Sequence, residues 1–163
     1  MAKSAIEKTN VMRLLDQKKV AYTPHTYPHG DDAVDGVTVA QMTGMDPAKV
    51  FKTLVARGAS KTPYVFVIPV ACELDLKKAA KAVGEKSIAM LHVSELTALT
   101  GYVRGGCSPV GMKKQLRTVF ASQALAQETI LVSAGKIGYQ VEVAPQALIA
   151  LVRAATAELT IES

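Results

Sequence analysis

Apolar and polar residues follow two different periods along the chain, and these periods predict its helices and strands. Short alternating or β-prone segments predict strands, whereas apolar residues three and four positions apart predict helices. The predicted strands cover 20–27, 50–56, 64–69, 117–121, 129–133 and 139–143. The predicted helices cover 4–17, 38–42, a short segment from 46, 75–83, 94–101 and a segment that begins at 145.

Capping residues mark the ends of several of these helices. Ser4 has the spacing of a capping box with Glu7, and Asp75 is a second candidate N-cap. Gly84 and Gly101 stand where glycine commonly ends a helix, because glycine adopts positive φ without steric cost. The sequence therefore predicts a first helix starting at Ser4 and two later helices that end at these glycines.

The order of the predicted elements favours one fold class. Loops over 57–62 and 134–138 are short and contain glycine, so each predicts a hairpin of antiparallel strands. Helices and strands interleave, yet the hairpins argue against a doubly wound parallel sheet. We therefore expect a mixed α/β fold of the α+β type, with a curved, largely antiparallel sheet flanked by helices.

Length and composition set the broad class of protein. The chain has 163 residues, of which 49% are hydrophobic and 20% charged, so we expect one globular domain over residues 1–163. The longest apolar run, 64–72, is too short to cross a bilayer, and the first ten residues lack the apolar segment of a secretion signal. We therefore expect no membrane association, a cytoplasmic location, and reduced thiols at Cys72 and Cys107.

Positive charge is concentrated in the second half of the chain. The net charge is +5, and 103–127 contains Arg104, Lys113, Lys114 and Arg117 but no acid. Such a basic cluster favours a polyanionic partner such as nucleic acid. The alternative is an ordinary solvated surface, and charge alone does not decide between the two.

The common chemical motifs are absent from the sequence. His25 and His29 are four residues apart, but Pro28 lies between them and the acidic ligands of a metalloprotease are missing. The two cysteines lack CxxC spacing, so we expect no metal site and no cofactor. Cys107, in a glycine-rich loop, remains open as a covalent nucleophile or as a small buried residue.

Lys52 interrupts an otherwise apolar strand, at 50–55. Strict alternation places Lys52 and Leu54 on one face and Phe51 and Thr53 on the other. A cation in that position extends to solvent or faces a site that holds an anion. Both interpretations stay open from the residues alone.

Several segments together resemble the YbaK/EbsC family. They are Val50-Phe51-Lys52-Thr53-Leu54, Gly101-Tyr102, the glycine loop over 105–111, Val132-Ser133-Ala134-Gly135-Lys136, Leu74-Asp75-Leu76-Lys77-Lys78 and His25-Thr26-Tyr27. The resemblance extends over about residues 5–155, in order and spacing. It implies a curved, partly barrel-like α/β fold related to the editing domain of bacterial prolyl-tRNA synthetase. It also implies a trans-editing deacylase that removes cysteine mischarged onto tRNA(Pro).

The resemblance also implies which residues form the site. Lys52, Gly105 and Gly106 would be catalytic, and the residues that bind the aminoacyl group would be Tyr27, Asp35, Ser108, Ser133 and Gln140. We add Lys113, Lys114 and Arg117 as the residues that hold the acceptor end of the tRNA. The chain departs from close YbaK relatives at two positions, with Asp35 in place of a pocket aromatic and Gln140 in place of an aspartate.

The expected mechanism needs no nucleophile from the protein. The resemblance implies that the thiol of the cysteinyl ester attacks its own carbonyl, so the protein supplies orientation and charge stabilisation. One alternative is a related deacylase for another substrate such as Ala-tRNA(Pro), for which the site would have to activate water. The other is a non-catalytic module that binds tRNA or a synthetase. The expected partners are tRNA rather than DNA, with prolyl-tRNA synthetase as a candidate.

Overall fold

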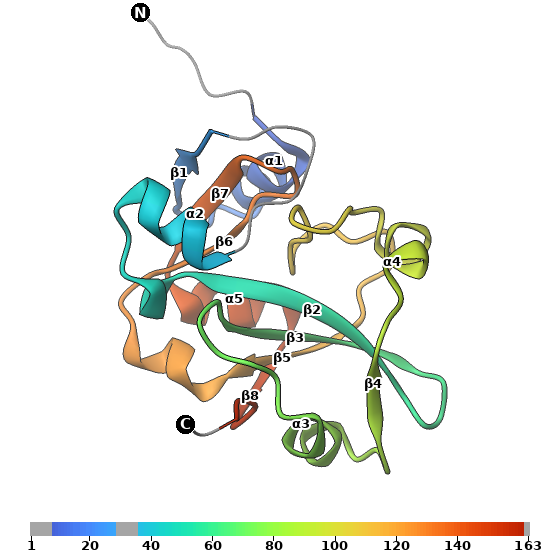
Figure 1. Ribbon diagram of the computed structural model, residues 1–163. Helices are drawn as coiled ribbons and strands as arrows, with labels where there is room; N and C mark the ends of the chain where they lie inside the picture. Colours follow the sequence, from blue (N-terminus) through green and yellow to red (C-terminus); the bar gives the residue numbers. More distant parts are fainter. Residues whose placement is uncertain (1–7, 29–35, 162–163) are drawn as a thin grey trace, which may run out of the picture.

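The computed structural model of the chain describes residues 8–28 and 36–161 (Figure 1). The helices are α1 (Asn10–Gln17), α2 (Gly36–Thr43), α3 (Leu76–Val83), α4 (Val93–Thr100) and α5 (Pro145–Val152), with short 3-10 helices η1 (Pro47–Lys49) and η2 (Ser122–Ala126). The strands are β1 (Thr23–Thr26), β2 (Phe51–Gly58), β3 (Pro63–Pro69), β4 (Ile88–Met90), β5 (Arg117–Ala121), β6 (Ile130–Ser133), β7 (Tyr139–Val143) and β8 (Ala155–Ala157). Helices and strands interleave, as the sequence predicts.

The strands form two sheets that meet at one bridge. In the first sheet β7 lies between β1 and β6 and is antiparallel to both. The second sheet has the order β4-β2-β3-β5-β8. In it β2 is antiparallel to β4 and β3, whereas β5 is parallel to β3 and β8. A parallel bridge between Val50 and Leu131 joins the start of β2 to β6. The predicted mixed, largely antiparallel arrangement and both predicted hairpins are confirmed, and the described strands do not close into a barrel.

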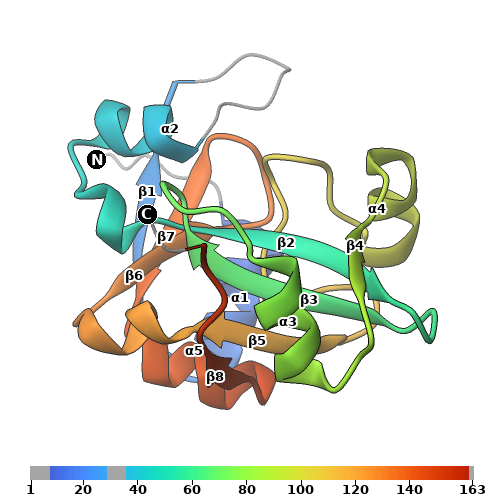
Figure 2. The same cartoon turned by 60° about the horizontal axis from the view of Figure 1, so that its bottom comes forward.

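The main apolar core lies between the two sheets and the helices α1 and α5. Leu15 of α1 and Leu148 of α5 are fully buried there, with Val132 of β6 and Val141 of β7. Helix α3 packs on the opposite face of the five-stranded sheet, where Ala79 contacts a second apolar cluster. Figure 2 shows α3 on one side of β3 and β5 and α1 on the other. The outer side of the junction between the two sheets is covered by α2.

A third, small apolar cluster marks that junction. Ala40 of α2 packs with Val50 and Leu131, the two residues of the bridge between the sheets. Val50 and Leu131 therefore direct their side chains to the same side of the junction. This orientation fixes where their neighbours on β2 and β6 point.

The helix ends differ in part from the prediction. Helix α1 begins at Asn10, because Thr9 caps it by accepting a hydrogen bond from the Met12 N–H at 3.2 Å. The predicted start at Ser4 is therefore wrong, since residues 8 and 9 are not helical, and Ser4 itself lies outside the described residues. Asp75 caps α3 as predicted, and Gly84 and Gly101 end α3 and α4 with positive φ.

Two short strands have no counterpart in the prediction. β4 and β8 have three residues each and lie at the two edges of the five-stranded sheet. Most of their side chains are exposed, so neither segment carries the apolar alternation by which a strand is recognised. Edge strands of this length depend on a neighbouring strand for their hydrogen bonds rather than on their own pattern.

Candidate active site where the two sheets meet

The first feature of the site is the alignment of polar residues across β1, β7 and β6. His25 lies opposite Gln140, and Gln140 lies opposite Ser133. Residues directly opposite in a sheet direct their side chains to the same face. His25, Gln140 and Ser133 therefore occupy one line across the three-stranded sheet, on the face turned away from the main core.

Lys52 extends this line into the second sheet. Val50 and Leu131 form the parallel bridge between the sheets. Lys52 lies two residues after Val50, and Ser133 lies two residues after Leu131. Because side chains alternate along a strand, Lys52 shares the face of Val50, and Ser133 shares the face of Leu131. Lys52 and Ser133 thus both lie on the outer face of the junction, each two residues past the bridge. We call His25, Gln140, Ser133 and Lys52 the polar row.

Tyr27 lies on the same face of the sheet as His25, two residues further along the chain. Its N–H donates to the Gly138 carbonyl at 2.9 Å, which continues the pairing of β1 with β7. The side chain is buried, with 7% of its surface exposed. The predicted pocket residues Tyr27, Ser133 and Gln140 therefore share one face of the three-stranded sheet.

The glycine loop packs against the turn between β6 and β7. A side-chain carbon at Gly106 would lie 3.2 Å from the Ile137 nitrogen and 3.4 Å from the Lys136 backbone, so any other residue there would push this backbone outward by a few tenths of an ångström. The Gly106 N–H donates to the Val103 carbonyl at 3.0 Å, and Gly105 has a φ of +85°. The loop therefore lies, by close backbone contact, against the turn that joins β6 to β7, between Ser133 and Gln140 of the polar row.

Ser108 closes the far side of this loop. Its side chain is fully buried, and its hydroxyl oxygen accepts a hydrogen bond from the Val110 N–H at 3.2 Å. Cys107, next to it, belongs to the main core, and burial raises the pKa of its thiol to about 12. The thiol is thus protonated at neutral pH and is a poor nucleophile.

Gln140 is the most unusual member of the polar row. Only 7% of its surface is exposed, and its amide oxygen is fully buried without a hydrogen-bond partner among the described residues. A buried acceptor without a donor costs about 1–3 kcal/mol. Buried acceptors of this kind are ordinarily satisfied by an ordered water, an ion or a ligand group.

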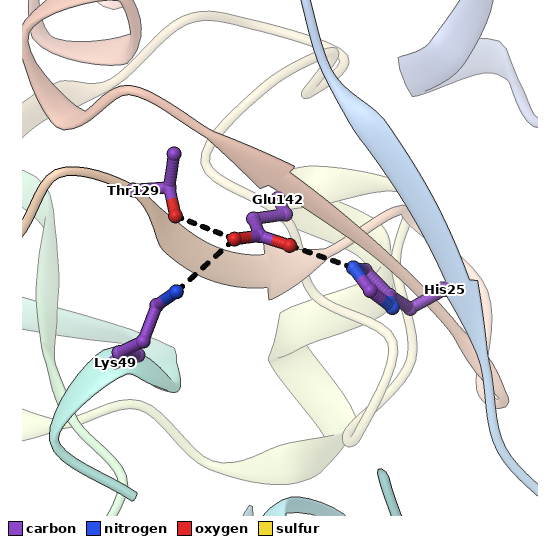
Figure 3. Close-up of polar contacts among 4 residues, drawn as sticks. All are labelled: His25, Lys49, Thr129 and Glu142. Atoms are coloured by element: carbon purple, nitrogen blue, oxygen red, sulfur yellow. Dashed lines mark hydrogen bonds and ion pairs between the residues drawn. The ribbon is translucent and has the colours of Figure 1, made fainter. Parts of the chain in front are cut away.

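Next to the row, Glu142 binds three donors from three other segments (Figure 3). It accepts from the Thr129 hydroxyl at 2.5 Å, from His25 Nε2 at 2.8 Å and from Lys49 Nζ at 3.1 Å. The hydrogen bonds from Thr129, His25 and Lys49 lower the pKa of Glu142 to about 2, so it is ionised at neutral pH. We call these four residues the Glu142 cluster. Through these contacts Glu142 connects β7 to β1 and to η1, the short helix that precedes β2.

The family model for the aminoacyl-tRNA editing domain matches residues 31–151. The chain belongs to this family. The match spans the glycine loop and all members of the polar row except His25. The family resemblance and the fold expected from it are therefore confirmed.

Individual relatives of this editing domain agree with that assignment. A protein of Enterococcus faecalis, named as a candidate Cys-tRNA(Pro)/Cys-tRNA(Cys) deacylase, EbsC, is 47% identical over 158 residues, covering 97% of this chain and 96% of its own. Among solved structures, a candidate trans-editing enzyme for prolyl-tRNA synthetase superposes with a TM-score of 0.80 at 24% identity, covering 93% and 95% of the two chains. A scaffold protein from a study of epitope grafting gives a TM-score of 0.81 at 26% identity, covering 94% and 96%.

The predicted tRNA-binding residues of the editing domain lie between the glycine loop and the start of β5. Lys113 is exposed and packs along Gly101, at the end of α4, and Lys114 follows it. Arg117 is the first residue of β5 and pairs with Tyr64 of β3. Lys52 of β2 pairs with the residue that lies four positions after Tyr64 on the same strand. At about 3.3 Å per residue, Arg117 is thus roughly 13 Å along the sheet from the polar row, and two strands to the side of β2.

Other sequence predictions have different outcomes. Asp35 lies outside the described residues. Among residues 8–28 and 36–161, no group of three His, Cys, Asp or Glu side chains is placed to hold a metal ion. Over the same ranges, no helix is both long enough and apolar enough to cross a membrane.

The Glu142 cluster and the position of His25 were not predicted. The alternation of 139–143 places Gln140 and Glu142 on one face, and this signal could have indicated a second polar residue next to the pocket. Nothing in the sequence, however, pairs 25 with 140. The editing domain thus has polar groups next to its predicted pocket that only the strand register reveals.

Proposed function

We propose that this chain is a trans-editing hydrolase that deacylates Cys-tRNA(Pro) by attack of the substrate thiol on its own ester carbonyl. The observation that carries this proposal is the 47% identity, over nearly the whole chain, to the Enterococcus faecalis protein named as a candidate Cys-tRNA(Pro)/Cys-tRNA(Cys) deacylase. Membership of the aminoacyl-tRNA editing family supports the reaction class. The protonated state of Cys107 supports a mechanism without a protein thiolate.

The proposed reaction requires only proton transfers and one nucleophilic attack. The cysteinyl thiol loses its proton, and the sulfur attacks the carbonyl carbon. The bond from that carbon to the ribose oxygen breaks, and this oxygen takes up a proton to restore the tRNA hydroxyl. Water then opens the resulting thiolactone to free cysteine. The protein's task is to hold the ester in a reactive geometry and to stabilise developing negative charge.

Lys52 is the proposed source of that positive charge. It is half-buried at the junction of the sheets, on the same outer face as Ser133. No hydrogen bond or ion pair within the described residues occupies its ammonium group. In our proposal the ammonium binds the terminal ribose–phosphate or the departing ribose oxygen.

The glycine loop is the proposed binding site for the carbonyl oxygen. Because the Gly106 N–H already donates to Val103, Gly106 shapes the loop rather than supplying a donor. The N–H groups of Gly105 and Cys107 have no acceptor among the described residues. They are therefore the proposed donors to the carbonyl oxygen, while Ser108 holds the loop by accepting from Val110.

The tRNA and the synthetase enter the proposal as partners. Lys113 and Lys114 are exposed on the segment that follows the glycine loop, where they would contact the acceptor stem. Arg117 would contact it only if the RNA extended along the sheet. Because this surface is small, we propose that prolyl-tRNA synthetase contributes to the choice of tRNA.

Single-turnover deacylation of Cys-tRNA(Pro), Cys-tRNA(Cys) and Ala-tRNA(Pro) tests the proposal. We expect the protein to cleave the cysteinyl esters fastest, and Lys52→Ala to lower this rate by roughly tenfold to a hundredfold, the effect of losing a hydrogen bond to a charged group. Lys86→Ala, which removes an exposed lysine after α3, is the control and should keep the full rate.

Three results would contradict the proposal in different ways. Faster cleavage of Ala-tRNA(Pro) would favour the related deacylase. Binding of tRNA without turnover would favour the non-catalytic module. An unchanged rate in a folded Lys52→Ala protein would remove Lys52 from the mechanism.

A further inference from the structure

The side chain of Tyr102 lies between the glycine loop and the turn that joins β6 to β7. Its hydroxyl donates to the Val110 carbonyl, near the end of the loop. A side-chain carbon at Gly111 would lie 2.8 Å from the Tyr102 hydroxyl oxygen, and one at Gly135 would lie 3.0 Å from the edge of its ring. Tyr102 is therefore in close contact with the end of the loop on one side and with the turn on the other.

The backbone of Tyr102 is fixed by side chains of α4. Its carbonyl accepts from the Thr97 hydroxyl at 2.9 Å, and its N–H donates to the Thr100 hydroxyl oxygen at 3.0 Å. Burial raises the pKa of the Tyr102 hydroxyl to about 12, so this group is protonated at neutral pH and can donate. With its backbone held by α4 and its hydroxyl on Val110, Tyr102 joins the two ends of the segment that contains the glycine loop.

The loop contacts the turn at two places, and both lead to groups of the proposed site. At the first, Gly106 approaches the backbone of Ile137. At the second, Tyr102 contacts Gly135, whose N–H donates to the Ser133 hydroxyl oxygen at 3.1 Å. Tyr102 thus touches both the loop and the residue that binds Ser133, a member of the polar row. A change in its position would move the loop relative to Ser133.

We propose that Tyr102 is a positioning residue for deacylation, because it holds the glycine loop against the β6–β7 turn and so fixes the N–H groups of Gly105 and Cys107 relative to Ser133. This inference rests on the proposed function, which assigns these N–H groups to the carbonyl oxygen of the ester. Tyr102 acts through the loop and does not contact the substrate. Donors to a developing oxyanion are effective only when they are held in place before the reaction, so a loosened loop lowers the rate of the chemical step.

Tyr102→Phe isolates the hydroxyl, because it keeps the ring and removes only the bond to Val110. We expect the single-turnover rate for Cys-tRNA(Pro) at saturating protein to fall roughly threefold to tenfold, the effect of losing one neutral hydrogen bond. The protein concentration at half-saturation should stay the same, because the contacts to the RNA are unchanged. Tyr64→Phe is the matched control. It also removes a donating hydroxyl, which binds Glu85 at 2.6 Å in the β2–β3 hairpin, and it should keep the full rate.

A pair of glycine variants tests the same contact from the other side. Gly111 and Gly84 have nearly equal positive φ, +78° and +74°, so alanine is strained to a similar degree at both. The methyl group of Gly111→Ala would meet the Tyr102 hydroxyl at 2.8 Å and Leu14 at 3.0 Å, whereas nothing lies within 4 Å of the one in Gly84→Ala. We expect Gly111→Ala to slow the saturated reaction at least as much as Tyr102→Phe, and Gly84→Ala to keep the full rate. The double variant with Tyr102→Phe should be no slower than Gly111→Ala alone, because both changes break one contact.

Amide hydrogen exchange reports on the loop without the reaction. The Gly106 N–H donates to the Val103 carbonyl at 3.0 Å within the loop, so its exchange rate measures how often this part of the loop opens. We expect Tyr102→Phe to speed the exchange of this amide several-fold, as measured by NMR. Tyr64→Phe should leave it unchanged.

The outcomes separate this inference from the function on which it rests. A wild-type protein that fails to cleave Cys-tRNA(Pro) contradicts the proposed function, and the exchange of the Gly106 amide then decides whether Tyr102 holds the loop. An active wild-type protein with an unchanged saturated rate in Tyr102→Phe contradicts the inference alone.

Two further results would also overturn the inference. Equal slowing by Tyr102→Phe and Tyr64→Phe would show a general effect of lost stability. A higher half-saturating concentration with an unchanged saturated rate would show a role in RNA binding. If Tyr102→Phe does not fold, the glycine pair decides, and equal rates of Gly111→Ala and Gly84→Ala would reject the positioning role.

Discussion

The two faces of the three-stranded sheet β1-β7-β6 differ in almost every physical property. One face contributes Val132, Val141 and Val143 to the main core, where each is at most 1% exposed. The other face carries His25, Gln140 and Glu142, with an ion pair and a buried acceptor that has no donor among the described residues. The strands are the same, so only the alternation of side chains separates the two environments.

This difference indicates how one small sheet serves both stability and chemistry. On the core face the side chains fill space, and each buried methyl group adds to the free energy of unfolding. On the polar face, the buried amide oxygen of Gln140 has no donor among the described residues, and an unsatisfied acceptor of this kind lowers stability. We therefore expect substitutions on the core face to change stability and substitutions in the polar row to change activity.

The largest effect on stability is expected at Glu142. This residue lies on the polar face, so it is an exception to the expectation that stability depends on the core face. The pKa of Glu142 falls from 4.5 to about 2 on folding, so its ionised form stabilises the folded state above pH 4.5. That stabilisation, on the order of 3 kcal/mol, is lost as the pH falls from about 4.5 to about 2. We expect Glu142→Gln to be less stable at pH 7 and to show a flatter dependence of unfolding free energy on pH, measured by urea denaturation.

Glu85 provides the matched control for this prediction. It also accepts from hydroxyl groups, those of Ser60 and Tyr64, and its pKa is lowered by these hydrogen bonds. Glu85 lies at the open surface of the β2–β3 hairpin, however, where water replaces a lost partner. Glu85→Gln should therefore leave the pH dependence nearly unchanged. Equal effects of the two substitutions would contradict the importance of the Glu142 cluster.

The next largest effect is expected from the core face. Val141→Ala removes two methyl groups at a fully buried position and should lower the unfolding free energy by about 2 kcal/mol. Its rate of Cys-tRNA(Pro) deacylation, measured below the unfolding transition, should stay near that of wild type. If Val141→Ala slowed the reaction as strongly as Lys52→Ala, it would be wrong to assign stability to the core face and activity to the polar row.

Much of the fold could be predicted because its strongest patterns are local. The continuous apolar segment 64–69 and the hairpin turn over 134–138 indicated β3 and the β6–β7 pair without knowledge of the rest of the chain. The edge strands β4 and β8 could not be found, because their exposed side chains follow no period. Their structure comes from pairing with β2 and β5.

The candidate site was predictable only in part. Alternation alone placed Lys52 on a face with Leu54, and the family resemblance named Tyr27, Ser133 and Gln140. The alignment of these residues depends on two long-range pairings, residue 25 with 140 and Val50 with Leu131. Periodicity within one segment contains no information about such registers, and so the position of His25 could not be inferred from the sequence.

The smallest effect on activity is expected at Cys107, which belongs to the core face although it lies in the glycine loop. Its thiol is buried, its pKa is raised to about 12, and it packs in the main apolar cluster. Cys107→Ser should therefore deacylate Cys-tRNA(Pro) within about twofold of wild type, since a protonated thiol supplies no nucleophile. It should unfold at a slightly lower urea concentration, because a hydroxyl replaces a less polar group in the core. A folded but inactive Cys107→Ser protein would instead place covalent chemistry in the loop, and the polar row would then serve binding alone.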